Sequence, residues 1–417
     1  MKSVKHILFL VYIINLFRAF LTFKVSSIIE FEDYDLVNYY KPTAQNLYNV
    51  YITNDPYLLG LSGFVTPLFP IFLKIFGYGL FARFIYIIIF VLILILVYKI
   101  TLKLSSKKIA EIAILLVSLE PSLFISSLSL APELLFSFTL TLALYFGVCK
   151  PMKNTELNYI VLGILLGVSV LIRPIALIMI ICLIVFWTVT YFQTSQTIFL
   201  YTSIIAIVFA LAWSIRNSLV HGFFNISSIS SNNIFLYEGV PALSEAKGIP
   251  FEEAKNIESA LKKQIIGDDP SVLELYDYNS KRGLELIFEN PIGWIQSHLN
   301  GVGKVLFGVY KSKYRIIDQK VFGVNDQVIQ SIHFIVLGFI TLIIWLLFLN
   351  GVNKFHKLDV LNSRVFLLIL IAILLPATGQ VAYARFRSPV VPIICIVAAL
   401  GTQDLLSKIN KVIKWKK

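Results

Sequence analysis

Apolar runs of about 20 residues constrain the fold of this chain more than any other feature. One of them, LFARFIYIIIFVLILILVYKI, begins at Leu80 and contains only two charged residues. A helix of about 20 apolar residues crosses the hydrocarbon core of a bilayer. Only 14% of the residues are charged, whereas soluble domains have about 25%. The sequence therefore predicts an all-α polytopic membrane protein with about ten spans, at about 7–24, 80–98, 109–128, 131–149, 158–172, 174–192, 197–215, 331–350, 364–380 and 388–405.

Lysines gather on one side of these predicted spans. They lie in the short loops around 99–108, 150–153 and 354–357, near the N-terminus and in the C-terminal tail. Lys and Arg in short loops favour the cytoplasmic side. We therefore expect both termini to be cytoplasmic, which requires an even number of spans. The first run lacks a small-residue cleavage site after it, so we interpret it as a retained span.

Polar segments divide the chain into three predicted parts. Residues 1–215 form an N-terminal transmembrane module whose first outer loop is 25–79, and residues 331–417 form C-terminal transmembrane helices with a basic cytoplasmic tail. Between them, 216–330 is the most polar part, with the turn cluster GDDP and the helical pattern FEEAKNIESALKKQI. It predicts a small extracytoplasmic domain. Within it, NPIGWIQSHLNGVGKVLFGVY is amphipathic, and we expect it to lie along the membrane interface with Trp294 as an anchor.

Cysteine usage and net charge argue against two other kinds of site. The three cysteines, Cys149, Cys182 and Cys395, all lie in apolar runs without a metal-binding spacing, so we interpret them as small core residues. The net charge of +12 comes from lysines at the ends of apolar runs, which is the pattern of membrane topology. Nucleic acid is therefore not expected as a partner.

The stretch FEDYDLVNYY places several carboxylates beside the first span. In a helical reading, Glu32, Asp35 and Tyr39 share one face. In an extended reading, Asp33 and Asp35 share one face instead. A carboxylate here can take the proton of an attacking hydroxyl as a general base. The plainer alternative is a solvated acidic loop or a helix cap.

Two glutamates lie in predicted spans. Glu133 follows Ala-Pro at the start of one span, where a carboxylate commonly complements the helix dipole. Glu120 lies within the span 109–128, just before Pro121. An ionisable group at that depth is a functional candidate, or it extends to the outer surface.

Four arginines lie at the outer ends of spans, namely Arg173, Arg216, Arg385 and Arg387. Positive charge on this side goes against the usual bias. A guanidinium binds phosphate oxygens in a bidentate manner and stays charged. The alternative for each arginine is extension toward lipid head groups.

Taken in order, these motifs resemble the GT-C superfamily of multispan glycosyltransferases. Within it they resemble the bacterial family-39-like branch of protein O-mannosyltransferases and the aminoarabinose transferase of lipid A. The resemblance begins with the spacing of Asp35, Tyr40 and Ala44 and continues through TPLFPIFLKIFG and the APELLF text around Glu133. It then passes through GILLGVSVLIRPIAL, AWSIRNSLVHGFFNISSISSNNIFLYEG and ARFRSPVVPIICIVAALG. The chain departs from the family pattern at AW, where relatives have PW, and at SNN, where they have a glycine.

This resemblance implies a cell-envelope enzyme that uses a sugar on a polyprenyl phosphate as its donor. An aspartate of the first outer loop activates the acceptor hydroxyl, a position that falls on Asp35 or Asp33. The acceptor is a lipid, a glycan or a protein. The resemblance implies donor or substrate contacts for Arg385, Arg387, Arg216, Arg173, Glu133 and Tyr40. A single base without a carboxylate nucleophile implies direct displacement with inversion. A divalent metal bridged by Asp35 and Glu133 stays open, because no ligand spacing supports it.

Alternative functions also fit a chain of this span count. A lipid-linked-sugar transporter or flippase would place charges near the membrane midplane and repeat its two halves, and the sequence shows mainly charges at span ends and no repeat. An oligosaccharide polymerase would also use outer arginines. The early acidic loop favours the transferase over both.

Overall fold

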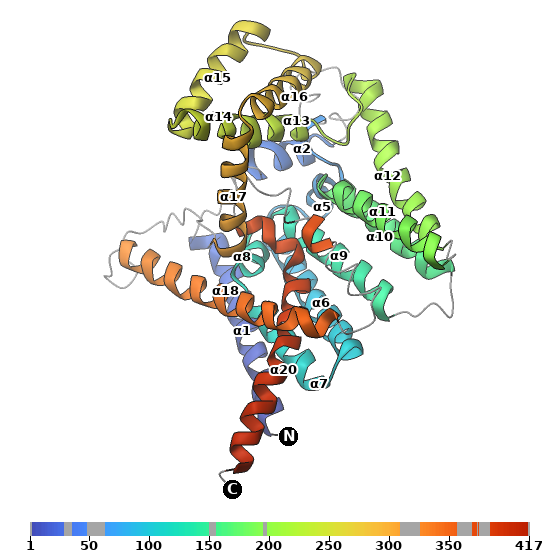
Figure 1. The fold of residues 1–417 in the computed structure, drawn as a ribbon, viewed down its shortest axis with the longest axis vertical. Helices are drawn as coiled ribbons and strands as arrows, with labels where there is room; N and C mark the ends of the chain where they lie inside the picture. The colour runs from blue at the N-terminus through green and yellow to red at the C-terminus, as the bar shows by residue number, and fades with distance from the viewer. Residues whose placement is uncertain are drawn as a thin grey trace.

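The computed structural model describes residues 2–28, 36–47, 63–149, 156–194, 198–308, 326–356, 369–372, 374 and 384–415. Every regular element in these ranges is a helix, and none of the described residues is in a strand. Figure 1 shows a bundle of long helices with a group of shorter helices stacked at one end. Both chain ends lie at the opposite end of the molecule, so the termini share one side (Figure 1).

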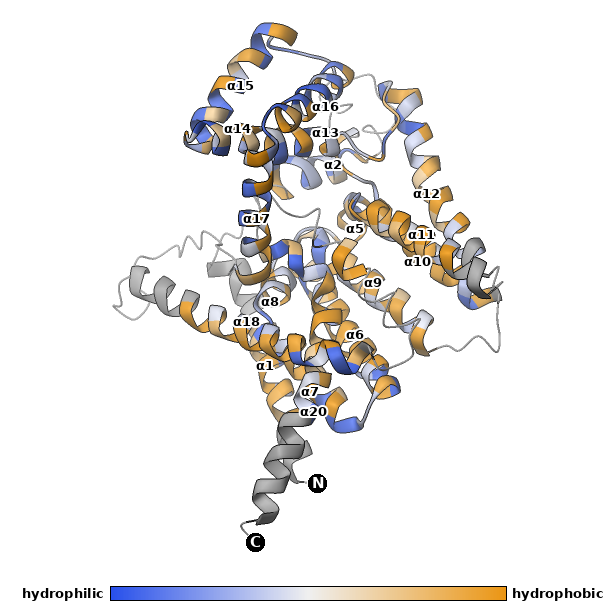
Figure 2. Ribbon diagram, in the orientation of Figure 1, coloured by the Kyte–Doolittle hydropathy of each residue, from blue (hydrophilic) through white to orange (hydrophobic). Residues whose placement is uncertain are grey.

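The long bundle is built from the apolar runs. Its helices are α1 (Lys2–Ile28), α5 (Leu68–Phe76), α6 (Leu80–Leu104), α7 (Lys107–Leu119), α8 (Pro121–Leu128), α9 (Pro132–Cys149), α10 (Glu156–Ile172), α11 (Ala176–Thr194), α12 (Ile198–His221), α18 (Asp326–His356), the 3₁₀ helix η4 (Ala384–Val390) and α20 (Val391–Trp415). Figure 2 shows that apolar residues dominate them. Among the described residues, five helices are long and apolar enough to cross a membrane, or six if the bent pair α7–α8 forms one span. Shorter apolar helices are Ile7–Phe20, Leu157–Ile172 and Ala176–Val189. The predicted all-α polytopic fold is confirmed, and the predicted number of ten spans is not.

Glycines allow the bundle helices to approach closely. A Cβ on Gly163 or Gly167 of α10 would lie within 2.8 Å of α12 atoms, so this pair forms a small-xxx-small contact. The crossing of α18 and α20 is tighter still. A Cβ on Gly351 would lie 1.9 Å from the Val397 carbonyl oxygen, and one on Gly401 would lie 2.0 Å from that of Leu347. Backbone therefore packs directly on backbone at this crossing.

The predicted span 109–128 is interrupted in the structure. Helix α7 ends at Leu119 and α8 starts at Pro121, with a bend of 61° between them. Pro121 lacks the N–H needed to continue α7, but it suits the first turn of a new helix. Glu120 caps α8 by accepting a 2.8 Å hydrogen bond from the Leu123 N–H. The carboxylate that was expected inside a continuous span is therefore a helix cap.

A second, smaller core lies in the stacked end of the molecule. Its helices are α13 (Ile229–Asn233), the π-helix η3 (Ile234–Gly239), α14 (Val240–Lys247), α15 (Phe251–Ile266), α16 (Val272–Glu289) and α17 (Pro291–Phe307). Phe235, Val240, Leu243, Ala254 and Leu286 form their buried cluster. Figure 2 shows hydrophilic residues along α15 and α16. We call these elements, α13 to α17, the outer helices. The predicted domain boundaries at 215/216 and 330/331 stay predictions.

Helix α17 runs from the other outer helices toward the bundle, with its lower end near α8 (Figure 1). Trp294 is half-buried, and its indole N–H donates to Glu238 Oε2 at 2.7 Å. Its role as a membrane anchor stays a prediction. His298 Nδ1 lies 3.4 Å from the same oxygen. Burial raises the pKa of Glu238, while Trp294 and then His298 oppose the rise. Trp294 thereby joins α17 to η3.

Candidate functional site

A compact cluster of charged groups lies at the end of the bundle that is nearer to the outer helices. Arg173 Nη2 donates to Glu133 Oε1 and forms an ion pair with it. Arg385 Nε lies 3.8 Å from the same oxygen. Arg173 Nη1 also donates to the Tyr40 hydroxyl at 3.4 Å. These four side chains, called the Glu133 cluster below, come from four separate segments of the chain.

Local sequence places each member of the Glu133 cluster. Glu133 is in the first turn of α9 directly after Pro132, where the helix dipole favours a carboxylate. Arg173 follows the last residue of α10 and precedes Pro174, which biases it out of the helical conformation. Tyr40 ends the π-helix η1 (Leu36–Tyr40), which continues into α2 (Lys41–Gln45). Its ring packs edge-on against Phe69 of α5 at 4.8 Å.

The Glu133 cluster is only partly closed. The Glu133 side chain is 2% exposed, while those of Arg173 and Arg385 are 16% and 19% exposed. Glu133 Oε2 is buried and accepts no hydrogen bond within the described part of the chain. Arg173 and Arg385 thus share one carboxylate and each keeps part of its side chain accessible.

Arg387 belongs to a different, fully buried cluster. Its Nε donates to Glu120 Oε1 at 2.9 Å, and the side chain is 1% exposed. Its Nη1 donates to the Val305 and Leu306 carbonyls at 2.5 and 2.7 Å. The predicted outward extension to lipid head groups does not describe this arginine. We refer to Glu120, Arg387 and these carbonyls as the Arg387 cluster.

Arg216 lies at the outer end of α12, away from both clusters in the sequence. Its Nη1 donates to Asn217 Oδ1 at 2.8 Å and lies 3.0 Å from His221 Nε2. Asn217 in turn donates to the Asn225 and Ile226 carbonyls. Asn217 therefore stabilises the chain reversal that follows α12. Gly222 has a φ of +82° in this reversal, a conformation that favours glycine.

The predicted catalytic residues Asp33 and Asp35 lie outside the described residues. Leu36, directly after Asp35 in the chain, is the first residue of η1. No group of three or more His, Cys, Asp or Glu that could hold a metal ion occurs in the described ranges. The bridging of a metal by Asp35 and Glu133 stays a prediction.

Sequence reasoning missed the partner of Glu120 and the burial of Arg18. Arg18 of α1 is 2% exposed and donates to the Ser118 carbonyl at 2.9 Å. Its guanidinium also lies 3.4 Å from the centre of the Phe90 ring, a cation–π contact. The signal was present, because an arginine inside an apolar run needs partners within the protein.

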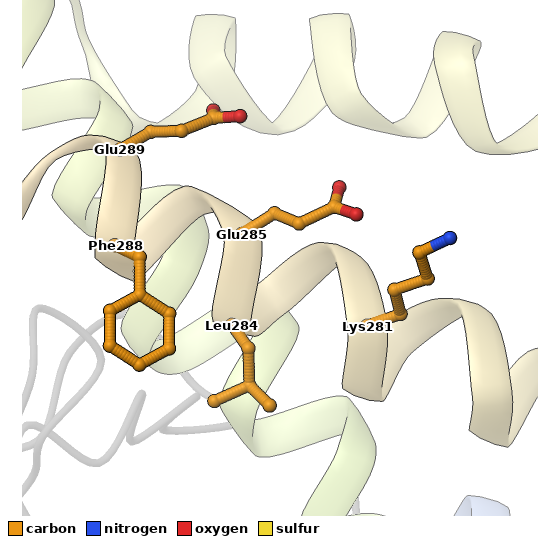
Figure 3. A pocket seen from close by; sticks show the side chains of 5 residues that line it. All are labelled: Lys281, Leu284, Glu285, Phe288 and Glu289. Atoms are coloured by element: carbon orange, nitrogen blue, oxygen red, sulfur yellow. The ribbon is translucent and has the colours of Figure 1, made fainter.

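Two pockets lie away from the Glu133 cluster. One, of about 470 Å³, is lined by five residues of α16: Lys281, Leu284, Glu285, Phe288 and Glu289. Figure 3 shows the Lys281, Glu285 and Glu289 side chains on one side of this helix and those of Leu284 and Phe288 on the other. The second, of about 210 Å³, is apolar and is lined by Val302, Val305, Leu306, Trp345, Leu370, Ile371 and Leu374. It lies beside the carbonyls that hold Arg387.

The fold and the Glu133 cluster define a polytopic helical membrane protein with two arginines gathered on one carboxylate near its outer helices. Residues 65–215 match the family described as dolichyl-phosphate-mannose-protein mannosyltransferase. This match confirms the predicted resemblance over these residues. No curated protein sequence matches the chain.

The solved structures that match this chain have low identity to it. The archaeal oligosaccharyltransferase AglB from Archaeoglobus fulgidus, in complex with an inhibitory peptide and a dolichol-phosphate, is 13% identical, with a TM-score of 0.44 over 97% of this chain and 51% of AglB. ArnT from Cupriavidus metallidurans bound to undecaprenyl phosphate is 11% identical, with a TM-score of 0.40 over 95% of this chain and 77% of ArnT. The chain thus spans about half the length of AglB. Likenesses at this level do not define a function.

Proposed function

We propose that this protein is a membrane glycosyltransferase that moves a sugar from a polyprenyl-phosphate donor to an acceptor hydroxyl on the extracytoplasmic face. The observation that carries the proposal is the Glu133 cluster, within a chain whose residues 65–215 match the mannosyltransferase family. Arg173 and Arg385 lie on one carboxylate and remain partly exposed. A guanidinium group can bind phosphate oxygens in a bidentate manner, which suits the phosphate of a lipid-linked donor.

In this proposal, the arginines stabilise the leaving group. The bond from the anomeric carbon to the phosphate oxygen breaks, and negative charge develops on the phosphate. Preorganised cationic donors at the position where charge develops are the most effective stabilisers of such a transition state. Glu133 holds Arg173 and Arg385 in place before the donor arrives. Tyr40 fixes the other side of the Arg173 guanidinium.

The acceptor side of the reaction is assigned to the first outer loop. Asp35 acts as general base, with Asp33 as the alternative, and takes the proton of the acceptor hydroxyl as its oxygen attacks the anomeric carbon. In this mechanism no carboxylate of the protein forms a covalent intermediate with the sugar. The single displacement therefore inverts the anomeric centre. Asp35 is separated by only four residues from Tyr40, which bonds Arg173. This short connection supports a role beside the Glu133 cluster.

The apolar pocket below α17 supports a lipid substrate. Val302, Trp345 and Ile371 are among the residues that line its 210 Å³. A hydrocarbon chain suits such a lining, because it needs no hydrogen-bond partners. A soluble nucleotide sugar would gain nothing from it.

The test of this function is transfer by the purified protein. We expect that protein in nanodiscs, given a polyprenyl-phosphate sugar and membrane extract as acceptor source, releases the sugar-free lipid phosphate, detected by mass spectrometry. Boiled protein is the control. Movement of the intact lipid-linked sugar between leaflets, without its cleavage, would instead support the flippase. Joining of donor sugars to one another would support the polymerase.

Orientation gives a separate prediction. In a chain whose three cysteines are replaced by alanine, we expect Asp269→Cys to react with a membrane-impermeant thiol reagent added outside intact cells. Lys107→Cys is expected to react only after the cells are opened, because the lysine-rich loops lie inside. Both positions are exposed in the structure. The reverse labelling pattern would place the outer helices in the cytoplasm.

A further inference from the structure

We propose that Arg387 and Glu120 are positioning residues that fix helix η4, and through it hold Arg385 against Glu133. This inference rests on the proposed function, in which Arg385 meets the donor phosphate. In this inference, Arg387 does not contact the donor directly, and it acts by positioning Arg385. The sequence motif ARFR then contains two arginines with different roles.

The donors of Arg387 are already occupied inside the protein. Nε donates to Glu120, Nη1 donates to two carbonyls, and Nη2 donates to the Gly308 carbonyl at 3.4 Å. The last carbonyls of a helix have no partner within that helix. Those of α17 therefore find theirs in Arg387, whose charge also complements the helix C-terminus. With its side chain 1% exposed, Arg387 has no open face for a phosphate.

The geometry of η4 separates the two arginines. A 3₁₀ helix has three residues per turn, so residues two positions apart point in different directions. Arg385 accordingly reaches Glu133 at the start of α9, whereas Arg387 reaches Glu120 at the start of α8. Any shift of η4 that breaks one of these contacts moves the other arginine as well.

Glu120 is itself held rigidly, so it can serve as a reference point for η4. Its Oε2 accepts from the Leu123 N–H and from the Ser122 hydroxyl, both at 2.8 Å. A second contact joins α8 to η4, because the Ser126 and Ser388 hydroxyl oxygens lie within hydrogen-bond distance, 2.8 Å apart. The bent α7–α8 pair therefore provides a fixed surface on which η4 rests.

The experiment compares single and double variants in binding undecaprenyl phosphate to protein in nanodiscs. We expect Arg385→Gln to weaken binding by about 10- to 100-fold, as for loss of a charge-assisted contact. We expect Arg387→Lys to weaken binding several-fold, because lysine cannot reproduce the forked contacts. Glu120→Gln, which keeps the shape of the cap, serves as the second probe of the same pair. In the Arg385→Gln background, neither Arg387→Lys nor Glu120→Gln should weaken binding further.

Two binding results would overturn the proposal. Losses that multiply in the double variants would mean that Arg387 contacts the phosphate itself. Unchanged binding in both Arg387→Lys and Glu120→Gln would mean that the Arg387 cluster stabilises the fold without positioning Arg385.

Hydrogen exchange separates this proposal from the proposed function. We expect faster amide exchange across 384–388 in Arg387→Lys and in Glu120→Gln, but not in Arg385→Gln. Unchanged exchange in all three would overturn the positioning role. If the wild-type protein does not bind undecaprenyl phosphate, the proposed function fails, while the exchange result still decides whether Arg387 and Glu120 hold η4.

Discussion

Turnover of Asp35→Asn is expected to fall by about 10²- to 10⁴-fold, the usual loss when a general base is removed. Asparagine keeps the size of the side chain and its ability to hydrogen-bond, but it cannot take a proton at neutral pH. Binding of undecaprenyl phosphate should therefore stay within about twofold of wild type, because the phosphate is assigned to Arg173 and Arg385. The measurement is the rate of release of sugar-free lipid phosphate, with binding measured on the same preparation.

Asp33→Asn is the matched control for Asp35, since the two differ by two positions in the same stretch. We expect it to retain most of the wild-type turnover. A collapse in Asp33→Asn, with normal turnover in Asp35→Asn, would reverse the two roles. Normal turnover in both variants would make the acidic loop solvated surface and would remove the base from the proposed mechanism.

The second large effect is expected at the crossing of α18 and α20, where Gly401→Ala should destabilise the protein by about 1–3 kcal/mol. The added Cβ would lie 2.0 Å from the Leu347 carbonyl oxygen and 2.8 Å from the Gly351 nitrogen. Both are backbone atoms, so the helices must separate to admit it. The Asn350 side chain, which donates to the Gly401 carbonyl, would lose its partner in the process. Thermal unfolding in detergent measures the change.

Gly303→Ala is the control for this substitution. Gly303 lies within α17, and a Cβ there would meet nothing within 4 Å. Alanine is favoured over glycine inside a helix by about 0.5–1 kcal/mol, so this variant should unfold at an equal or higher temperature. Similar destabilisation by both substitutions would mean that the close crossing is not the cause.

Apolar run length predicted the class of fold but not the path of each span. The apolar content of a run hardly changes when it contains a single proline, and thus the run 109–128 was predicted as one continuous helix. In the structure, Pro121 and the capping carboxylate of Glu120 turn the chain through 61°. The Ala-Pro-Glu text did predict a helix start at Glu133 correctly, because that signal is local.

Local sequence could suggest the members of the site but not their partners. Arg173 and Glu133 were candidates separately, and their pairing spans 40 positions. Arg385 and Arg387 looked equivalent because nothing in ARFRSP tells which side of a short helix faces the Glu133 cluster. Their difference comes from Glu120, which is 267 positions from Arg387 in the chain. The aspartates that carry the proposed chemistry remain assigned by resemblance.

The carbonyl of Leu306 has a mechanical consequence. It accepts hydrogen bonds from Arg387 on η4 and from the Trp345 indole on α18, the latter at 2.6 Å. A shift of the lower end of α17 away from η4 and α18 would break both bonds and leave their donors to find other partners. The two hydrogen bonds to the Leu306 carbonyl therefore fix the lower end of α17 to η4 and α18. A displacement of the outer helices is therefore expected to be passed to η4 through the Leu306 carbonyl.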